Sequence, residues 1–199
     1  MGRTTWIVGM ALFAGLTGSA DATAETADPL ALQVMLHDEI GIPLAALRQS
    51  QIEASRIFKA VGITLTWVPP GEVPANSLII KIVNTPIGHK SRNPNVLGVS
   101  PGSKDAPGRV AWLYYSRIQE LARFLHLEVA QLLGHVMAHE MGHLLLPYGA
   151  HAAAGLMKAG WDTRQAFLAA SSALTFEPSQ AALIRTRLRR ATQSLIPNP

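Results

Sequence analysis

Residues 139–157 read HEMGHLLLPYGAHAAAGLM, and this stretch decides what kind of domain the chain can form. It completes an apolar segment that begins near Leu127 and has helical spacing, so one long helix is expected up to Leu146. Pro147 ends that helix, because the residue before a proline is pushed out of the α region. His139 and His143 are four residues apart and therefore project from the same face of the helix.

This pair of histidines predicts a zinc site. Two imidazoles on successive turns can bind one Zn²⁺ through nitrogen. Glu140 leaves the helix at a different angle, so it can act as the general base on a water that the metal activates without becoming a ligand. The alternative is that the HExxH match is incidental and the side chains are ordinary surface residues. Burying two histidines and a glutamate on so apolar a helix would be costly without a purpose, which favours the zinc site.

The same stretch resembles the signature of the metzincin clan of zinc metallopeptidases, HExxHxxGxxH followed by a methionine in a tight turn. The resemblance implies that His139, His143 and His151 are the zinc ligands and that Glu140 is the general base. It also implies that Met157 lies beneath the metal. The expected activity is hydrolysis of peptide bonds by a zincin-like domain.

The sequence departs from that signature in the turn after the helix. Leu146 stands where the family has its glycine, and leucine does not easily adopt the left-handed conformation that glycine permits. His151 follows His143 by eight residues, where the family has six. We expect Pro147 and Gly149 to form a different, two-residue-longer turn that still returns His151 to the metal.

Other candidates for the third ligand remain open. A carboxylate from a later helix, as in gluzincins, would have to be Glu177 or Asp162, and Glu177 is expected to cap a helix instead. His135 lies one turn before the histidine pair, but three ligands spread over about 12 Å of helix cannot share one ion, so a core position is expected. Tyr148 could stabilise an oxyanion or be an exposed loop residue.

The rest of the chain predicts an α+β fold: a mixed, mostly antiparallel sheet packed on the zinc helix, with a helical C-terminal part. The strand at Val110–Tyr114 is expected to be the edge to which an extended substrate adds its backbone. The segment 84–108 is rich in Pro, Gly, Ser and Asn, and only 96–99 looks extended. Periodicity and turn residues predict strands over 30–37, 63–68, 77–83 and 109–115, and further helices over 43–61, 116–125, 162–174 and 179–193.

The first 24 residues predict a secretory signal peptide. Arg3 precedes an apolar run from Trp6 to Leu16, and small residues at 17–24 offer cleavage points. The run is shorter than the ~20 residues of a spanning helix, although a retained anchor is the alternative. Residues 25–199 are then a single zincin-like domain. The chain has no cysteine, which excludes disulfides, and a periplasmic or secreted location is expected.

The composition, 48% apolar and 15% charged, is that of a globular protein. A basic cluster at residues 185–190 is expected to be a solvated helix face, and a nucleic-acid or membrane partner is the alternative. The predicted function is therefore that of an exported zinc-dependent peptidase acting on peptide or protein substrates. No nucleic acid and no stable membrane span after signal cleavage are expected. The chief alternative is an exported zinc-binding structural or interaction protein without turnover.

Overall fold

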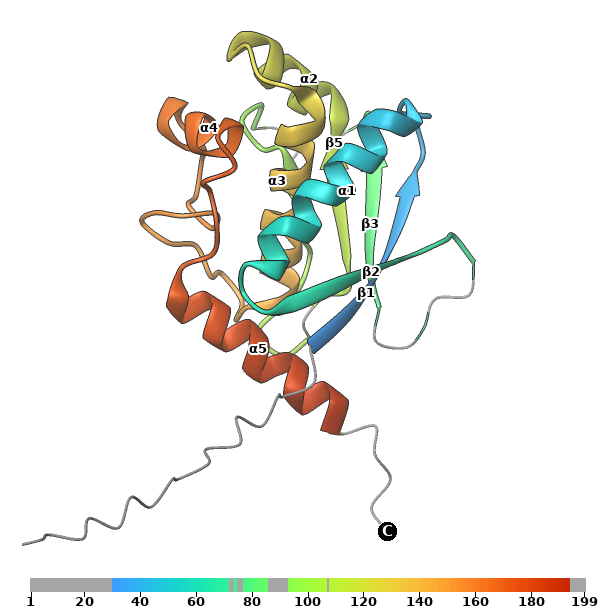
Figure 1. The fold of residues 1–199 in the computed structure, drawn as a ribbon, viewed down its shortest axis with the longest axis vertical. Helices are drawn as coiled ribbons and strands as arrows, with labels where there is room; N and C mark the ends of the chain where they lie inside the picture. Colours follow the sequence, from blue (N-terminus) through green and yellow to red (C-terminus); the bar gives the residue numbers. More distant parts are fainter. Residues whose placement is uncertain (1–29, 72–73, 75–76, 86–92, 107, 194–199) are drawn as a thin grey trace, which may run out of the picture.

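The chain folds into one layer of sheet covered by helices (Figure 1). The computed structural model describes residues 30–71, 74, 77–85, 93–106 and 108–193, so the predicted signal peptide at 1–24 lies outside the described part. In chain order the elements are β1 (Leu30–Asp38), α1 (Leu44–Lys59), β2 (Ile63–Val68), β3 (Leu78–Val83), β4 (Gly98–Val99), β5 (Val110–Tyr114), α2 (Tyr115–Phe124), α3 (Val129–Leu145), α4 (Thr163–Ala170) and α5 (Pro178–Gln193).

These elements match the expected strands and helices closely, with one clear difference. The helix expected over 162–174 ends at Ala170. Ser172 has a φ of 54°, which lies in the left-handed region and breaks the helical path. The chain then runs without regular structure to Pro178, where α5 begins.

The sheet corrects the predicted strand directions. Its five strands lie in the order β2-β1-β3-β5-β4. β1 pairs in parallel with both β2 and β3, and β3 pairs in parallel with β5. Only β4 is antiparallel to its neighbour. The expectation of a mostly antiparallel sheet was therefore wrong, and the fold is a mixed α/β arrangement with a mostly parallel sheet.

The alternating burial along β1 does not distinguish parallel from antiparallel pairing here. Along the first half of β1 burial alternates: Leu32 and Val34 are buried and Ala31 and Gln33 are exposed, whereas Met35 and Leu36 beyond them are both buried. Such alternation indicates that only one face of the sheet packs against the core, which is more common in antiparallel sheets. Here the crossover through α1 makes β1 and β2 parallel, while the helices still cover one face.

The edge of the sheet beside the helix α3 is β4. β5 lies between β3 and β4, so the expectation that Val110–Tyr114 forms an edge strand was also wrong. β4 pairs only Gly98 with Leu113 and Val99 with Trp112. This short strand brings the segment after it alongside α3.

Helix α3 is the central element of the helical layer. Its side chains are buried around most of its circumference, and it packs beside α1 over the sheet. A Cβ built on Gly134 would lie 2.7 Å from the carbonyl oxygen of Ser50 and 2.7 Å from Cβ of Glu53, so only glycine allows α1 to approach this closely. The helix that carries His139, Glu140 and His143 is therefore held firmly on two sides.

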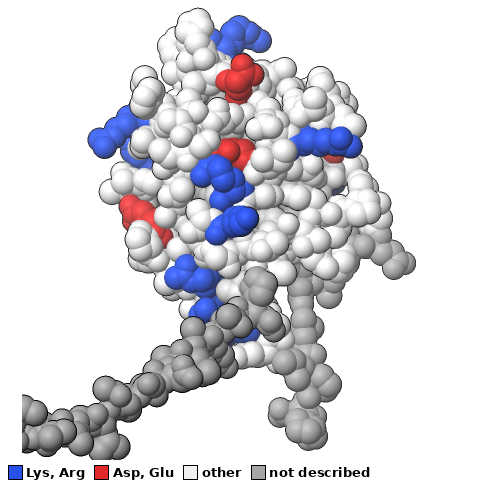
Figure 2. All heavy atoms as spheres, viewed as in Figure 1, with Lys and Arg blue, Asp and Glu red and all other residues white. Residues whose placement is uncertain are grey.

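None of the helices in the described part of the chain has both the length and the hydropathy of a membrane span. On the face shown in Figure 2, Lys and Arg side chains lie in small groups separated by uncharged surface, with Asp and Glu among them. Within the basic cluster, Arg185 donates a hydrogen bond to the carbonyl of Val61 at 3.1 Å. At least this arginine therefore tethers α5 to the domain.

Candidate metal centre

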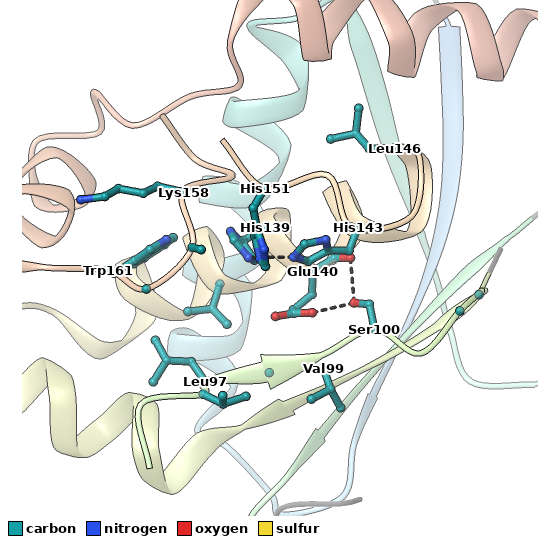
Figure 3. A pocket seen from close by; sticks show the side chains of 18 of the residues that line it. Leu97, Val99, Ser100, His139, Glu140, His143, Leu146, His151, Lys158 and Trp161 are labelled. Atoms are coloured by element: carbon teal, nitrogen blue, oxygen red, sulfur yellow. Dashed lines mark hydrogen bonds between the residues drawn. The ribbon is translucent and has the colours of Figure 1, made fainter. Parts of the chain in front are cut away.

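The histidines predicted as zinc ligands meet at one cavity of about 520 Å³ between α3, the segment around β4 and the loops after α3 (Figure 3). His139, Glu140 and His143 reach it from α3, and His151 reaches it from the loop that follows. Among the described residues, these three histidines are the group that could hold a metal ion. Their candidate ligand nitrogens all lie within 4.8 Å of one another.

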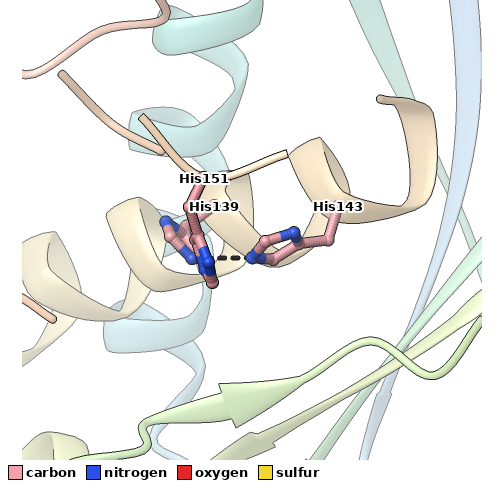
Figure 4. A group of neighbouring side chains, drawn as sticks. All are labelled: His139, His143 and His151. Atoms are coloured by element: carbon pink, nitrogen blue, oxygen red, sulfur yellow. Dashed lines mark hydrogen bonds between the residues drawn. The ribbon is translucent and has the colours of Figure 1, made fainter. Parts of the chain in front are cut away.

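The rings face one another at short range (Figure 4). Nε2 of His139 lies 3.1 Å from Nε2 of His143. The His151 ring centre is 4.6 Å from that of His143 and 5.9 Å from that of His139. His139 and His143 lie on neighbouring turns of α3, and His151 is brought to them by the loop that follows the helix.

A hydrogen bond fixes the orientation of the His139 ring. Its Nδ1 lies 2.7 Å from the carbonyl oxygen of Leu156, which can only accept, so Nδ1 carries the proton. In the neutral ring Nε2 then holds a lone pair directed toward His143. Such an arrangement is usual for a metal-binding histidine, whose second nitrogen is tied to a carbonyl or carboxylate.

The turn between His143 and His151 takes the longer form. Leu146 is extended (φ −92°, ψ 166°) and buried, so the leucine at the family's glycine position never needs the left-handed conformation. Gly149 adopts it instead, with a φ of 77°. Backbone hydrogen bonds from Ala150 to Pro147 (3.1 Å) and from His151 to Gly149 (2.7 Å) close the loop. Proline and glycine thus return the chain to the histidine pair in a manner different from the family signature.

Met157 lies buried against α3. A Cβ on Gly142 would overlap the sulfur of Met157 and come within 2.9 Å of Phe176, so Gly142 leaves the room that the methionine occupies. The backbone around Met157 is held by hydrogen bonds from Ala152 to Met157 (2.9 Å) and from Leu156 to Thr175 (2.8 Å). The turn at 156–157 therefore directs the Leu156 carbonyl toward His139 and packs Met157 against α3.

Glu140 is buried and directed at the segment that follows β4. The hydroxyl of Ser100 lies 2.6 Å from its Oε2 and 2.9 Å from its backbone oxygen. A Cβ on Gly98 would lie 2.8 Å from Cγ and 2.9 Å from Oε1 of the same side chain. Sequence reasoning missed both Ser100 and Gly98. A glycine within a short extended segment was the available signal, since it often marks a close approach of another group.

Trp161 is a further residue that the sequence did not single out. Its ring packs edge-on against that of His139, with centroids 6.1 Å apart, and also against that of His135 at 6.2 Å. It lines the cavity beside the rings of the three histidines (Figure 3). The side chain therefore forms an apolar wall next to the first histidine of the pair.

His135 lies outside the candidate metal centre. Its side chain is fully buried, with Nδ1 3.0 Å from the carbonyl of Gln131 and Nε2 3.3 Å from Oε1 of Glu53. Glu53 in turn accepts two hydrogen bonds from Arg56. Burial lowers the pKa of His135, opposed by its hydrogen bond to Gln131 and by the charge of Glu53. The expected core position for this histidine agrees with the structure.

The carboxylates considered as alternative third ligands have other positions. Asp162 caps α4 by accepting hydrogen bonds from the backbone of Arg164 and Gln165, and it pairs with Lys158 at 2.6 Å. The backbone of Glu177 accepts the first helical bond of α5 from Ala181. Neither residue is in the histidine group. Tyr148 lines the cavity and is 63% exposed.

The donor set fits a tetrahedral transition ion. Two nitrogens bound to zinc at about 2.0–2.1 Å are separated by about 3.3 Å in tetrahedral geometry, close to the 3.1 Å between His139 and His143. Three imidazoles suit zinc and similar ions, and catalytic zinc sites commonly use three protein ligands with the fourth position for water or substrate. Three histidine ligands would leave a fourth position for water or substrate.

No family model matches the sequence, and no curated protein matches it. Among solved structures, the crystal structure of metalloproteinase-II from Bacteroides fragilis is similar to 82% of this chain, with 14% sequence identity and a TM-score of 0.47. This chain spans 55% of the length of that protein. The function proposed below rests on the residues of the site.

The environment of His139 predicts how the stability of the metal-free protein depends on pH. Burial disfavours the imidazolium cation and lowers the pKa of His139 to about 4, although the hydrogen bond to Leu156 opposes this shift. The unfolded chain takes up that proton near pH 6.5. Neutral His139 therefore makes its full contribution to the stability of the folded state above about pH 6.5, and this contribution is lost as the pH falls toward about 4. Thermal melting of chelator-treated protein between these pH values should show the loss. His139→Gln should reduce the slope, and an identical slope in both proteins would contradict the assignment.

Proposed function

We propose that this protein is an exported zinc-dependent peptidase that hydrolyses peptide bonds. The observation that carries the proposal is the meeting of three histidine nitrogens within 4.8 Å with a buried glutamate beside them in one cavity. Structural zinc sites are usually closed by four protein ligands. A site of three histidines with an adjacent carboxylate is instead suited to hydrolysis.

In this proposal His139, His143 and His151 hold the zinc ion. When bound, zinc acidifies water and polarises the carbonyl of the bond to be cleaved. Glu140 serves as the general base: its carboxylate takes a proton from the attacking water and delivers it to the leaving nitrogen. Leu156 supports this arrangement by accepting the Nδ1 proton of His139, which directs Nε2 into the site.

The walls of the cavity favour an extended peptide as substrate. Gly98 and Val99 of the edge strand β4 line it, opposite α3. An edge strand offers backbone groups to which a peptide can pair, while its side chains enter pockets. Trp161 and Leu97 provide apolar wall on the side of His139. Action in the periplasm or outside the cell is proposed from the signal-like residues 1–24 alone.

The proposal is tested with protein that lacks only the predicted signal segment, residues 1–24, and that is loaded with zinc. Metal analysis should find about one equivalent of zinc. The protein should cleave members of a broad peptide library, a chelator should stop cleavage, and added zinc should restore it. Absence of cleavage by the zinc-loaded protein across the library would contradict the peptidase proposal and favour a zinc-binding protein without turnover.

A further inference from the structure

Ser100 contacts Glu140 at both its carboxylate and its backbone oxygen. It follows directly after β4, and its hydroxyl oxygen lies 2.6 Å from Oε2 and 2.9 Å from the backbone oxygen of that glutamate. Figure 3 shows both contacts as dashed lines across the gap between the strand and α3. The Ser100 side chain therefore contacts both the carboxylate and the backbone of Glu140.

This geometry restrains the carboxylate. A length of 2.6 Å lies in the range of a hydroxyl that donates to an ionised carboxylate, which is about 2.5–2.7 Å. The hydroxyl has a single proton, so the contact with the backbone oxygen at 2.9 Å is the second branch of a shared hydrogen bond. That carbonyl belongs to the buried helix α3. The contacts of Ser100 therefore restrict the rotation of the flexible Glu140 side chain relative to the helix.

Gly98 limits the carboxylate from the other side. A Cβ on Gly98 would lie 2.8 Å from Cγ and 2.9 Å from Oε1 of Glu140, and 2.9 Å from the carbonyl oxygen of Trp112. The backbone of β4 at Gly98 therefore lies directly against the Glu140 side chain. Oε2 is thus held by Ser100, and the Oε1 side packs over Gly98. The two residues come from one tripeptide, Gly98-Val99-Ser100, that the sheet places against α3.

We propose that Ser100 is a positioning residue for Glu140, holding the carboxylate in the orientation from which it serves the site. This inference rests on the proposed function, in which Glu140 is the general base. Displacement of a catalytic group by about 1 Å can cost about 100-fold in rate. Losing one of several restraints should cost less, because Gly98 and the helix remain.

The kinetic test compares Ser100→Ala, Ser100→Thr and Ser171→Ala in the zinc-loaded protein. Ser100→Ala should lower kcat about tenfold and leave KM nearly unchanged, because the carboxylate is less often in place while substrate binding is intact. Ser100→Thr retains a hydroxyl and should keep most of the activity. Ser171 bonds only backbone carbonyls on the exposed end of α4, so its loss is the matched control and should have no effect. Equal loss in the alanine and threonine variants, or no loss in either, would overturn the proposal.

A second measurement requires no turnover. In metal-free protein labelled with ¹³C-glutamate, the side-chain carboxyl resonance of Glu140 is identified by its absence in Glu140→Gln. Ser100→Ala should shift that resonance, whereas Ser100→Thr and Ser171→Ala should leave it close to the wild-type position. An unmoved resonance in Ser100→Ala would overturn the contact. A wild-type protein that cleaves nothing would contradict the proposed function alone, and the resonance would still decide the role of Ser100.

Discussion

Replacement of Glu140 with glutamine is expected to leave zinc bound and to lower peptide cleavage by roughly 10²–10⁴-fold, the usual contribution of a general base. Glutamine has nearly the same shape and can still accept a hydrogen bond from Ser100 through its amide oxygen, so the site should keep its form. It cannot take a proton from water. The rate should therefore fall in kcat while zinc content and thermal stability stay near those of the wild type.

The control for this variant is Glu39→Gln, which removes a surface carboxylate that pairs with Lys81 and does not line the cavity. That change should alter neither zinc content nor cleavage. The measurement is kcat and KM on the best library peptide, with zinc quantified in the same samples. If Glu140→Gln cleaves as fast as the wild type, Glu140 is not the general base.

Replacement of His151 with alanine is expected to weaken zinc binding by at least ~100-fold. Loss of a single outer hydrogen-bond partner of a metal ligand already costs about 10–100-fold in affinity, and loss of a ligand should cost more. His139 and His143 would remain on their helix, but two imidazoles alone make an incomplete site. Competition with a chromophoric chelator at neutral pH measures the change directly.

His37→Ala is the matched control for the histidine experiment. His37 lies on β1 with a half-exposed side chain 3.7 Å from Glu39, outside the histidine group. Its removal should not alter zinc affinity. Wild-type zinc affinity in His151→Ala would place the third ligand elsewhere in the chain, and the resemblance to the metzincin signature would then fail at its last histidine.

Much of the helical architecture could be predicted from local patterns. α3 was expected over Leu127–Leu146 and runs from Val129 to Leu145. Its end follows from Pro147, and the common face of His139 and His143 follows from a spacing of four residues. These features depend on neighbours within one or two turns, so the order of residues is enough to define them.

The strand directions and the edge of the sheet could not be read in this way. Alternation along β1 showed that one face is buried but carried no information about its partners, which come from residues 63–68 and 78–83. The place of β4 beside β5 likewise depends on a pairing between separate segments. Strand order is a property of contacts distant in sequence, and several orders are compatible with the same buried face.

By itself, then, the sequence determined the helix, its histidine pair and the adjacent glutamate, because α-helical geometry converts spacing directly into direction. It left open whether an irregular turn with leucine at the glycine position would bring His151 back. Tertiary structure decided that through Gly149, and it also placed Ser100 and Gly98 against Glu140, which follows them by 40 and 42 residues. Those contacts join segments whose distance apart is set by the packing of β4 against α3, which no local pattern encodes.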